Sequence, residues 1–206
     1  EAMSETVWEE MKARLDVMKA AAYAGIKERE KSYSGLVGDD ACRLWNSHLL
    51  VGETAGRAAA YAMGISEVNA RMGRIVACPT AGSCGILPGT ILAAGEFWQC
   101  EEAVLIRALF TAAGIGKVIA ENASVAGAVG GCQAECGSAA AMAAAAVVEM
   151  AGGSPRQSSA AAALALKNLL GLVCDPVGGL VEVPCVKRNA FAAVHALVAA
   201  QMALAG

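Results

Sequence analysis

Apolar residues recur along most of the chain at the three- to four-residue spacing of amphipathic α-helices. The first such stretch opens with Thr6 and Glu9, a pair that predicts a capping box, and its apolar positions continue to Ala22. Further helical patterns cover residues 41–62, 66–73, 90–100, 102–114 and 139–148, a stretch that ends at 170, and the last residues, 189–206. Sustained alternation of β-branched residues, which would indicate strands, is almost absent. The pattern predicts an all-α fold, a compact helical bundle rich in alanine and glycine.

Glycine, proline and polar residues interrupt the helical pattern in four irregular segments. The segments span residues 31–40, 78–88, 121–137 and 174–185. The last three also carry cysteines, and in the first we expect Asp39 or Asp40 to cap the following helix. Irregular backbone in apolar surroundings leaves N–H and C=O groups without partners, which is costly unless a ligand or cluster uses them. The alternative, tight turns with inert buried thiols, stays open from composition alone.

Composition and charge narrow the classes of partner. The 206 residues suit one domain with a sizeable core, and we expect a single catalytic domain over residues 1–206. The net charge of −3, with scattered basic residues, argues against nucleic acid and against an anionic membrane surface. Although 56% of the residues are apolar, many are alanine, and the runs at 139–148 and 189–206 are too short or too polar to span a membrane. No signal peptide precedes the first helix, so we expect eight reduced cysteines in the cytoplasm.

The spacing of the cysteines restricts the metal sites that the chain can form. No C-x-x-C motif occurs, so the zinc-ribbon and ferredoxin patterns are absent. Cys132, Cys174 and Cys185 are too far apart in the chain to form a compact local motif. Spacing alone is therefore weak support for a metal site, and the residues around these cysteines are more informative.

Those surrounding residues resemble the signature segments of the iron–sulfur L-serine dehydratase alpha chain. The similar segments follow in order along nearly the whole chain: Ser34–Asp39, Pro79–Ser83, Glu121–Ser124, Gly131–Glu135, Cys174–Leu180 and Val183–Asn189. The resemblance implies that Cys132, Cys174 and Cys185 hold a [4Fe–4S] cluster. It also implies that the family's alpha chain continues beyond the point that matches Gly206, so we expect its C-terminal tail to be missing here.

Three protein ligands would leave one iron of such a cluster open to act as a Lewis acid. L-serine has a poor leaving group in its hydroxyl, and coordination to iron would make it a better one. A base that removes the Cα proton completes a β-elimination, and the product decays to pyruvate and ammonia. The resemblance therefore implies a lyase of amino-acid degradation and gluconeogenesis that works without pyridoxal phosphate.

Small residues in the second irregular segment are candidates for binding the substrate. The amides and hydroxyls of Thr80, Ala81, Gly82 and Ser83 would suit the substrate carboxylate, although a proline-bounded turn explains them too. Two residues of the third segment have a similar pair of interpretations. Asn122 and Ser124 either bind the substrate's polar groups or cap a helix.

The catalytic base is the least defined part of the prediction. The resemblance places Lys31 and Ser34 near the active site, and we expect His195 and His48 to be structural. Family members pair this chain with a beta chain that carries a Ser-Ser-His-Thr-type motif, which is absent here. The base therefore could come from the beta chain, and we expect the alpha chain alone to be inactive. Homo-oligomer formation stays open.

Two other functions remain compatible with the sequence. A related iron–sulfur lyase would act on L-cysteine or L-threonine with the same cluster and the same elimination. A non-catalytic cluster-binding protein would instead have a closed four-cysteine site. In the dehydratase, a spare thiol such as Cys84 or Cys136 could fill the open iron in a resting state. A pyridoxal phosphate enzyme is disfavoured, because the alternating strand–helix pattern of most such enzymes is missing.

Overall fold

The computed structural model describes residues 5–47 and 50–206. Over these residues the chain forms eight α-helices and one short 3-10 helix, with no strand beyond an isolated bridge between Val177 and Leu180. The helices are α1 (Glu5–Lys27), α2 (Asp40–Trp45), α3 (Glu53–Ala70), η1 (Ala81–Ser83), α4 (Ile86–Trp98), α5 (Glu102–Asn122), α6 (Gly127–Met150), α7 (Pro155–Asn168) and α8 (Glu182–Ala205). The prediction of an all-α fold is confirmed.

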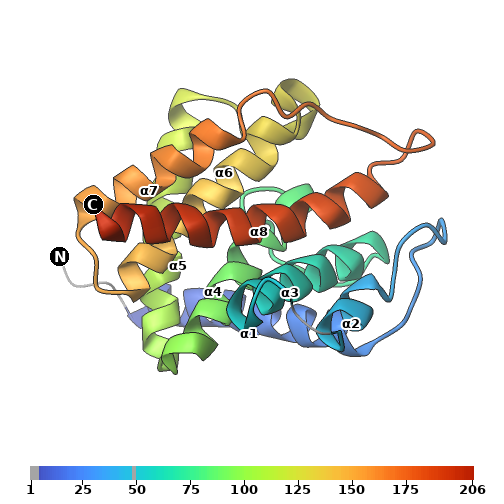
Figure 1. The fold of residues 1–206 in the computed structure, drawn as a ribbon, viewed down its shortest axis with the longest axis horizontal. Coiled ribbons are helices and arrows are strands. Elements are labelled where there is room, and N and C mark those ends of the chain that lie inside the picture. The colour runs from blue at the N-terminus through green and yellow to red at the C-terminus, as the bar shows by residue number, and fades with distance from the viewer. Residues whose placement is uncertain (1–4, 48–49) are drawn as a thin grey trace.

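Helix α8 crosses the middle of the molecule, with α6 and α7 on one side and α1 to α4 on the other (Figure 1). The alanine-rich part of α6 is buried almost without interruption, because α4, α5, α7 and α8 all pack against it. Small side chains allow helix axes to come close together. One such close approach is between α1 and α3, where a Cβ atom on Gly25 would lie 2.3 Å from the backbone of Gly64.

Helix boundaries in the first third of the chain differ from the prediction. The helix expected over 41–62 is divided, because α2 ends at Trp45 and α3 begins at Glu53 after Gly52, whose φ of 83° suits glycine. The separate helix expected over 66–73 is instead the continuation of α3 to Ala70. Gly64 does not break this helix because it lies against the backbone of α1.

Two expected helix caps are wrong. Thr6 is already helical as the second residue of α1, so it is not the N-cap. Asp39 does occupy the N-cap position of α2, but its side chain makes no capping hydrogen bond. Its carboxylate instead accepts a hydrogen bond from Lys31 at 3.0 Å and pairs with Arg43 at 3.1 Å. The carboxylate of Asp39 therefore interacts with two nearby cationic side chains and does not cap α2.

The cysteine-bearing segments are more regular than the expected loops. Helix α4 begins at Ile86, and Pro88 lies in its first turn, where a missing N–H breaks no intrahelical bond. Helix α6 includes Cys132 and is interrupted at Gly131, whose backbone has φ 69° and ψ −163°. Cys185 lies in the first turn of α8, so of Cys132, Cys174 and Cys185 only Cys174 belongs to an irregular loop.

One of the described helices, α5, is long and apolar enough to cross a membrane by length and composition. In the fold, 28% of its 18-residue apolar window is buried, and α5 lies against α6 and α1. Core helices can have the same length and composition, so these two properties do not test whether α5 spans a membrane. The absence of a membrane-spanning segment stays a prediction.

Candidate functional site

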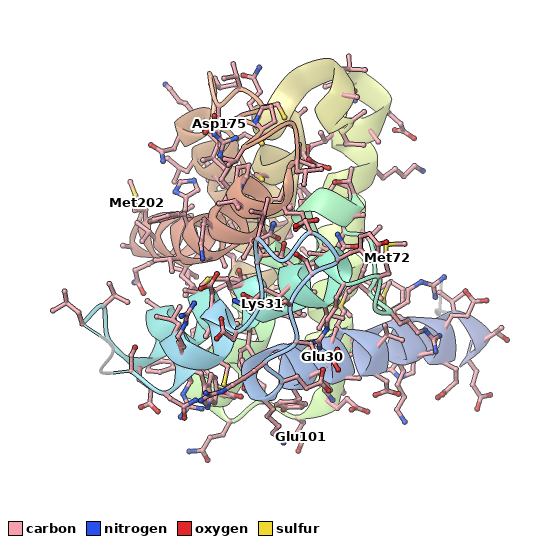
Figure 2. All side chains as sticks on the ribbon, turned by 90° about the vertical axis from the view of Figure 1, so that its right-hand side faces the viewer. Glu30, Lys31, Met72, Glu101, Asp175 and Met202 are labelled. Atoms are coloured by element: carbon pink, nitrogen blue, oxygen red, sulfur yellow. The ribbon has the colours of Figure 1, made fainter. Side chains whose placement is uncertain are left out.

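Cys132, Cys174 and Cys185 line one cavity of about 610 Å³. Cys132 is buried, Cys185 is half-buried and Cys174 is exposed at the entrance. The cavity lies where α3, the η1 segment, α6, the loop over 169–181 and the start of α8 meet. Figure 2 faces this end of the molecule and labels Lys31 and Asp175 on the two loops that project from it.

The break in α6 at Gly131 positions the first of these thiols. After the break, the amide of Gln133 no longer bonds within the helix and donates instead to the carbonyl oxygen of Leu172 at 2.7 Å. The side chain of Gln133 accepts a hydrogen bond from the amide of Gly171 at 2.8 Å. The loop after α7 thus supplies partners for the broken helix, and the two segments are held together.

Close backbone contact then brings Cys174 beside the break. A Cβ atom on Gly131 would lie 3.1 Å from the amide nitrogen of Cys174, so only glycine allows this approach without a shift. Arg188 of α8 contacts both the loop before Cys174 and helix α6. Its Nη1 donates to the Val173 carbonyl at 2.7 Å and to Cys132 Sγ at 2.9 Å. A single guanidinium therefore joins the loop, α6 and α8.

Asn189 joins the third cysteine to the η1 segment. Its Nδ2 donates to the carbonyl oxygens of Cys185 at 2.8 Å and Gly82 at 2.7 Å. Its Oδ1 accepts from the amide of Gly85 at 2.9 Å, which satisfies a free donor at the start of α4. Asn189 is fully buried, so its three hydrogen bonds set the distance between the η1 segment and α8 inside the fold.

The thiols differ in their ease of ionisation. The hydrogen bond with Cys136 and the guanidinium of Arg188 outweigh burial and lower the pKa of Cys132 to about 6. Burial and the negative charges of Cys132 and Glu135 raise the pKa of Cys185 to about 12. The pKa of Cys136 is raised by its hydrogen bond to Cys132 and by burial. Of Cys132, Cys136 and Cys185, Cys132 is therefore the thiol that ionises most readily.

The three thiols are of the ligand type that an iron–sulfur cluster would take. No three His, Cys, Asp or Glu side chains in the described ranges are close enough together to hold one ion. The three thiols instead surround a cavity, and a cluster takes its thiolate ligands at separate iron atoms, which spreads them apart. Thiolate ligands and a partly apolar wall are the surroundings that such clusters have in proteins.

The predicted carboxylate-binding segment divides into two parts. Ala81 and Gly82 line the cavity. Thr80 and Ser83 are hydrogen-bonded to each other behind it, at 3.1 Å between their hydroxyl oxygens, and Ser83 is fully buried. Thr80 also donates to the carboxylate of Glu135. The small residues Ala81 and Gly82 therefore line the cavity, while the hydroxyls of Thr80 and Ser83 hold the segment in place.

Asn122 and Ser124 make local hydrogen bonds outside the cavity lining. Asn122 Nδ2 donates to the carbonyl of Val118 at 2.8 Å, within the last turn of α5. Ser124 Oγ accepts from the amide of Ala126 at 3.1 Å, immediately before α6. Neither side chain caps α6, whose N-cap is Ala126 and has no side-chain capping bond. A role for Asn122 and Ser124 in substrate binding stays a prediction.

Lys31 and Ser34 lie in the loop that borders the cavity. Lys31 Nζ donates to the carbonyl of Gly38 at 2.8 Å and to Asp39, so it is engaged within its own loop. Ser34 Oγ donates to Glu182 Oε2 at 2.6 Å. Because Glu182 lines the cavity, this hydrogen bond attaches the loop to the cavity rim.

Several residues of the site were missed by the sequence reasoning. In the cavity lining these are the carboxylates Glu135 and Glu182 and the polar side chains Ser66 and Asn69. In α8 they are Arg188, which contacts Cys132, and Asn189, which contacts Gly82. Glu135 carries a signal that could have found it, since it is a charged residue one helical turn after Cys132 in a mostly apolar helix.

The remaining thiols and histidines are placed away from the lining. Cys136 contacts Cys132 from behind, and Cys84 is fully buried, which raises its pKa to about 12. His195 is half-buried, with Nε2 at 3.0 Å from the carbonyl of Ala165, as expected for a structural histidine. His48 lies outside the described residues.

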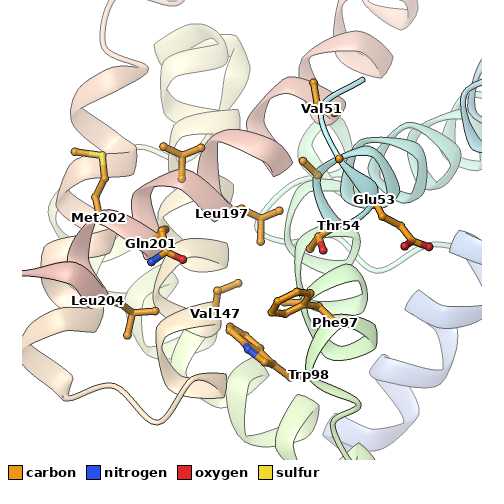
Figure 3. Close-up of a pocket in the computed structure, with 14 residues that line it drawn as sticks. Val51, Glu53, Thr54, Phe97, Trp98, Val147, Leu197, Gln201, Met202 and Leu204 are labelled. Carbon is orange, nitrogen blue, oxygen red and sulfur yellow. The ribbon is translucent and has the colours of Figure 1, made fainter. Parts of the chain in front are cut away.

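A second cavity is almost entirely apolar (Figure 3). It measures about 470 Å³, and Phe97, Trp98, Leu197 and Met202 contribute much of its wall. Glu53 is its one charged residue, and none of the eight cysteines lines it. Helix α8 borders both cavities, the thiol-lined one with its first turns and the apolar one with its last. Of these two cavities, the thiol-lined one carries the cysteines and two carboxylates, Glu135 and Glu182.

The fold and the cavity place this chain in the class of all-α proteins with a thiol-lined site. Comparison with known proteins adds the family. The family described as "Serine dehydratase alpha chain" matches residues 1–206. The chain belongs to the serine dehydratase alpha chain family.

Individual relatives agree with this assignment. The chain is 53% identical over 210 residues to the "Probable L-serine dehydratase, alpha chain" of Bacillus subtilis (strain 168), covering 100% of this chain and 70% of the relative. It is 44% identical over 206 residues to the "L-serine dehydratase, alpha chain" of Peptoniphilus asaccharolyticus, covering 98% and 70%. The "L-serine dehydratase" of Streptomyces coelicolor is 48% identical over 147 residues, which are 71% of this chain but 32% of that longer protein.

Proposed function

We propose that this chain is the alpha chain of an iron–sulfur L-serine dehydratase, which eliminates water from L-serine to give pyruvate and ammonia. One observation carries the proposal: Cys132, Cys174 and Cys185, which are distant in sequence, line the same cavity. The names of the relatives support L-serine as the substrate. The cytoplasm remains the proposed location, because eight free cysteines suit a reducing compartment.

The three thiolates are proposed to hold a [4Fe–4S] cluster. When bound, such a cluster supplies a Lewis acid at the iron that has no protein ligand. The chain's own contribution is to bring the sulfurs together. Arg188 holds Cys132 beside the loop of Cys174, and Asn189 holds Cys185 beside Gly82.

The rest of the cavity is proposed to bind and orient the amino acid. Ala81 and Gly82 present backbone toward it and remain the proposed contact for the substrate carboxylate. Apolar residues, including Ala70, Val181 and Val186, complete the wall and limit the entry of water. Lys31 is engaged by Gly38 and Asp39, so we propose that the base which removes the Cα proton comes from the beta chain.

The lengths of the relatives support such a partner. The Streptomyces coelicolor dehydratase is a single longer protein, and the aligned part of this chain covers 32% of it. The Bacillus subtilis and Peptoniphilus asaccharolyticus relatives are named as alpha chains. We therefore propose a beta chain as the partner that completes the active site.

Anaerobic reconstitution with iron and sulfide, in the presence of a beta chain, tests the proposal. We expect broad visible absorbance from the cluster and pyruvate release from L-serine, and loss of both in Cys132→Ser, Cys174→Ser and Cys185→Ser. Cys100→Ser is the matched control, because Cys100 is a partly exposed thiol outside the cavity lining. L-threonine and L-cysteine in place of L-serine separate the related lyases. A colourless wild-type protein, or one that binds a cluster without lyase activity, would refute the proposal.

A further inference from the structure

We propose that Glu135 recognises the α-ammonium group of the substrate and so selects amino acids over acids that lack an amino group. This inference rests on the proposed function and assigns one residue of its site. Glu135 lies on α6, one turn after Cys132, and lines the same cavity. A carboxylate at that position forms part of the wall of the cavity in which the amino acid is proposed to bind.

The carboxylate of Glu135 is held on three sides. Thr80 donates its hydroxyl hydrogen to Oε1. A Cβ atom on Gly82 would lie 2.8 Å from both carboxylate oxygens, and one on Gly127 would lie 2.6 Å from Oε2. Such distances are shorter than van der Waals contact, so glycine at both positions makes room for the carboxylate. The structure therefore positions this group within the cavity wall, as a preorganised binding residue requires.

The charge of Glu135 has no cationic partner among the residues with described side chains. None of the Lys, Arg or His residues there forms an ion pair with it, and none of them lines the cavity. The other carboxylate of the lining, Glu182, already accepts hydrogen bonds from Ser32 at 2.7 Å and Ser34 at 2.6 Å. A half-buried carboxylate without a cation favours a ligand that brings one.

The substrate of the proposed reaction carries such a cation. L-serine is a zwitterion, and its ammonium group offers three N–H donors to a carboxylate that receives only one hydroxyl hydrogen bond from Thr80. Contact between Glu135 and the ammonium would direct the amino acid's carboxylate and hydroxyl to the other parts of the cavity. An acid of the same shape without the amino group would gain nothing from Glu135.

The test compares ligands with and without the amino group in the reconstituted alpha–beta holoenzyme. L-alanine is an amino acid without a leaving group, so its dissociation constant is measured by anaerobic calorimetry. The inhibition constant of 3-hydroxypropionate, which is serine without the amino group, is measured against L-serine. Glu135→Gln keeps the size of the side chain and an acceptor for Thr80 but removes the charge. Loss of a charge-assisted hydrogen bond should weaken L-alanine about 10- to 100-fold and raise the KM for L-serine.

The same variant should leave 3-hydroxypropionate within about twofold and the visible spectrum of the cluster unchanged, because neither depends on the ammonium contact. Equal weakening of both ligands, no weakening of L-alanine, or loss of the cluster spectrum would each overturn the inference. Failure of the proposed function has a different signature, since it would show in the wild type as absence of cluster or of pyruvate release.

A second variant displaces the carboxylate without removing its charge. Gly127→Ala adds a methyl group 2.6 Å from Oε2 and should weaken L-alanine selectively, in the same direction as Glu135→Gln. Gly114→Ala is the matched control, because nothing lies within 4 Å of its added methyl group. If Gly127→Ala and Gly114→Ala bind L-alanine equally well, the carboxylate does not contact the amino group and the inference is wrong.

Discussion

Replacement of Asn189 by alanine should destabilise the protein more than any exposed substitution, because this side chain is fully buried and makes three hydrogen bonds. The two bonds donated by Nδ2, to Gly82 and Cys185, are each worth about 0.5–1.5 kcal/mol. The third loss leaves the buried amide of Gly85 without a partner, at about 1–3 kcal/mol. We therefore expect the free energy of unfolding to fall by about 2–6 kcal/mol.

Denaturation of the reduced chain in urea, followed by circular dichroism, measures this loss. Asn168→Ala is the control, since Asn168 is exposed and its side chain makes a single long contact of 3.4 Å with His195. That substitution should change stability by less than about 0.5 kcal/mol. Equal stability of the Asn189→Ala and Asn168→Ala variants would refute the reasoning.

The isosteric variant Asn189→Asp separates hydrogen bonding from packing. It keeps the acceptor for Gly85 but turns a carboxylate oxygen toward the carbonyl oxygens of Gly82 and Cys185. At neutral pH we expect a loss at least as large as that of alanine, because a buried charge then faces two acceptors. A stable aspartate variant would show that the two hydrogen bonds donated by Nδ2 contribute little to stability.

Two further predictions concern packing and pH. Gly25→Ala should destabilise the protein by about 1–3 kcal/mol or more, because the new methyl group would lie 2.3 Å from the backbone of α3. Gly114→Ala, in an exposed part of α5, should instead stabilise it by up to about 1 kcal/mol. Urea denaturation that changed the stability of both variants in the same direction would contradict this prediction. Burial opposes ionisation of Asp40, but hydrogen bonds from Lys187 and Arg43 outweigh it and lower the pKa of Asp40 below its ordinary value of 3.8. The wild type should be more stable than Asp40→Asn by about 1 kcal/mol or less. This difference should be fully present at pH values above 3.8 and should disappear as the pH falls through the lowered pKa of Asp40. A stability difference that increased at acidic pH would contradict the prediction.

Helix boundaries show where local pattern stops being sufficient. The sequence predicts a break around Pro88, but α4 already begins at Ile86, since the first turn of a helix tolerates proline. It predicts an irregular segment around Cys132, yet α6 continues on both sides of Gly131. Glycine marks both flexible turns and close contacts, and the pattern alone does not tell which of the two applies.

In the candidate site, the sequence identified the segments that form the cavity but not all of the side chains that matter in it. The segments that carry the three cysteines and the η1 loop were identifiable from the resemblance, and all of them border one cavity. Glu135 and Asn189 were not singled out, because their importance depends on partners that are far away in the chain. Thr80 is the partner of Glu135, and Gly85 is a partner of Asn189.

The sequence by itself determined the class of fold, since helical periodicity and alanine-rich composition act over a few residues. It also determined which thiols to consider. Only the tertiary structure decided that these thiols line one cavity, because that depends on backbone contacts between distant segments, such as Gly131 against Cys174. It likewise decided that a carboxylate without a cationic partner faces the same cavity, since burial and pairing of charge are properties of the packed chain.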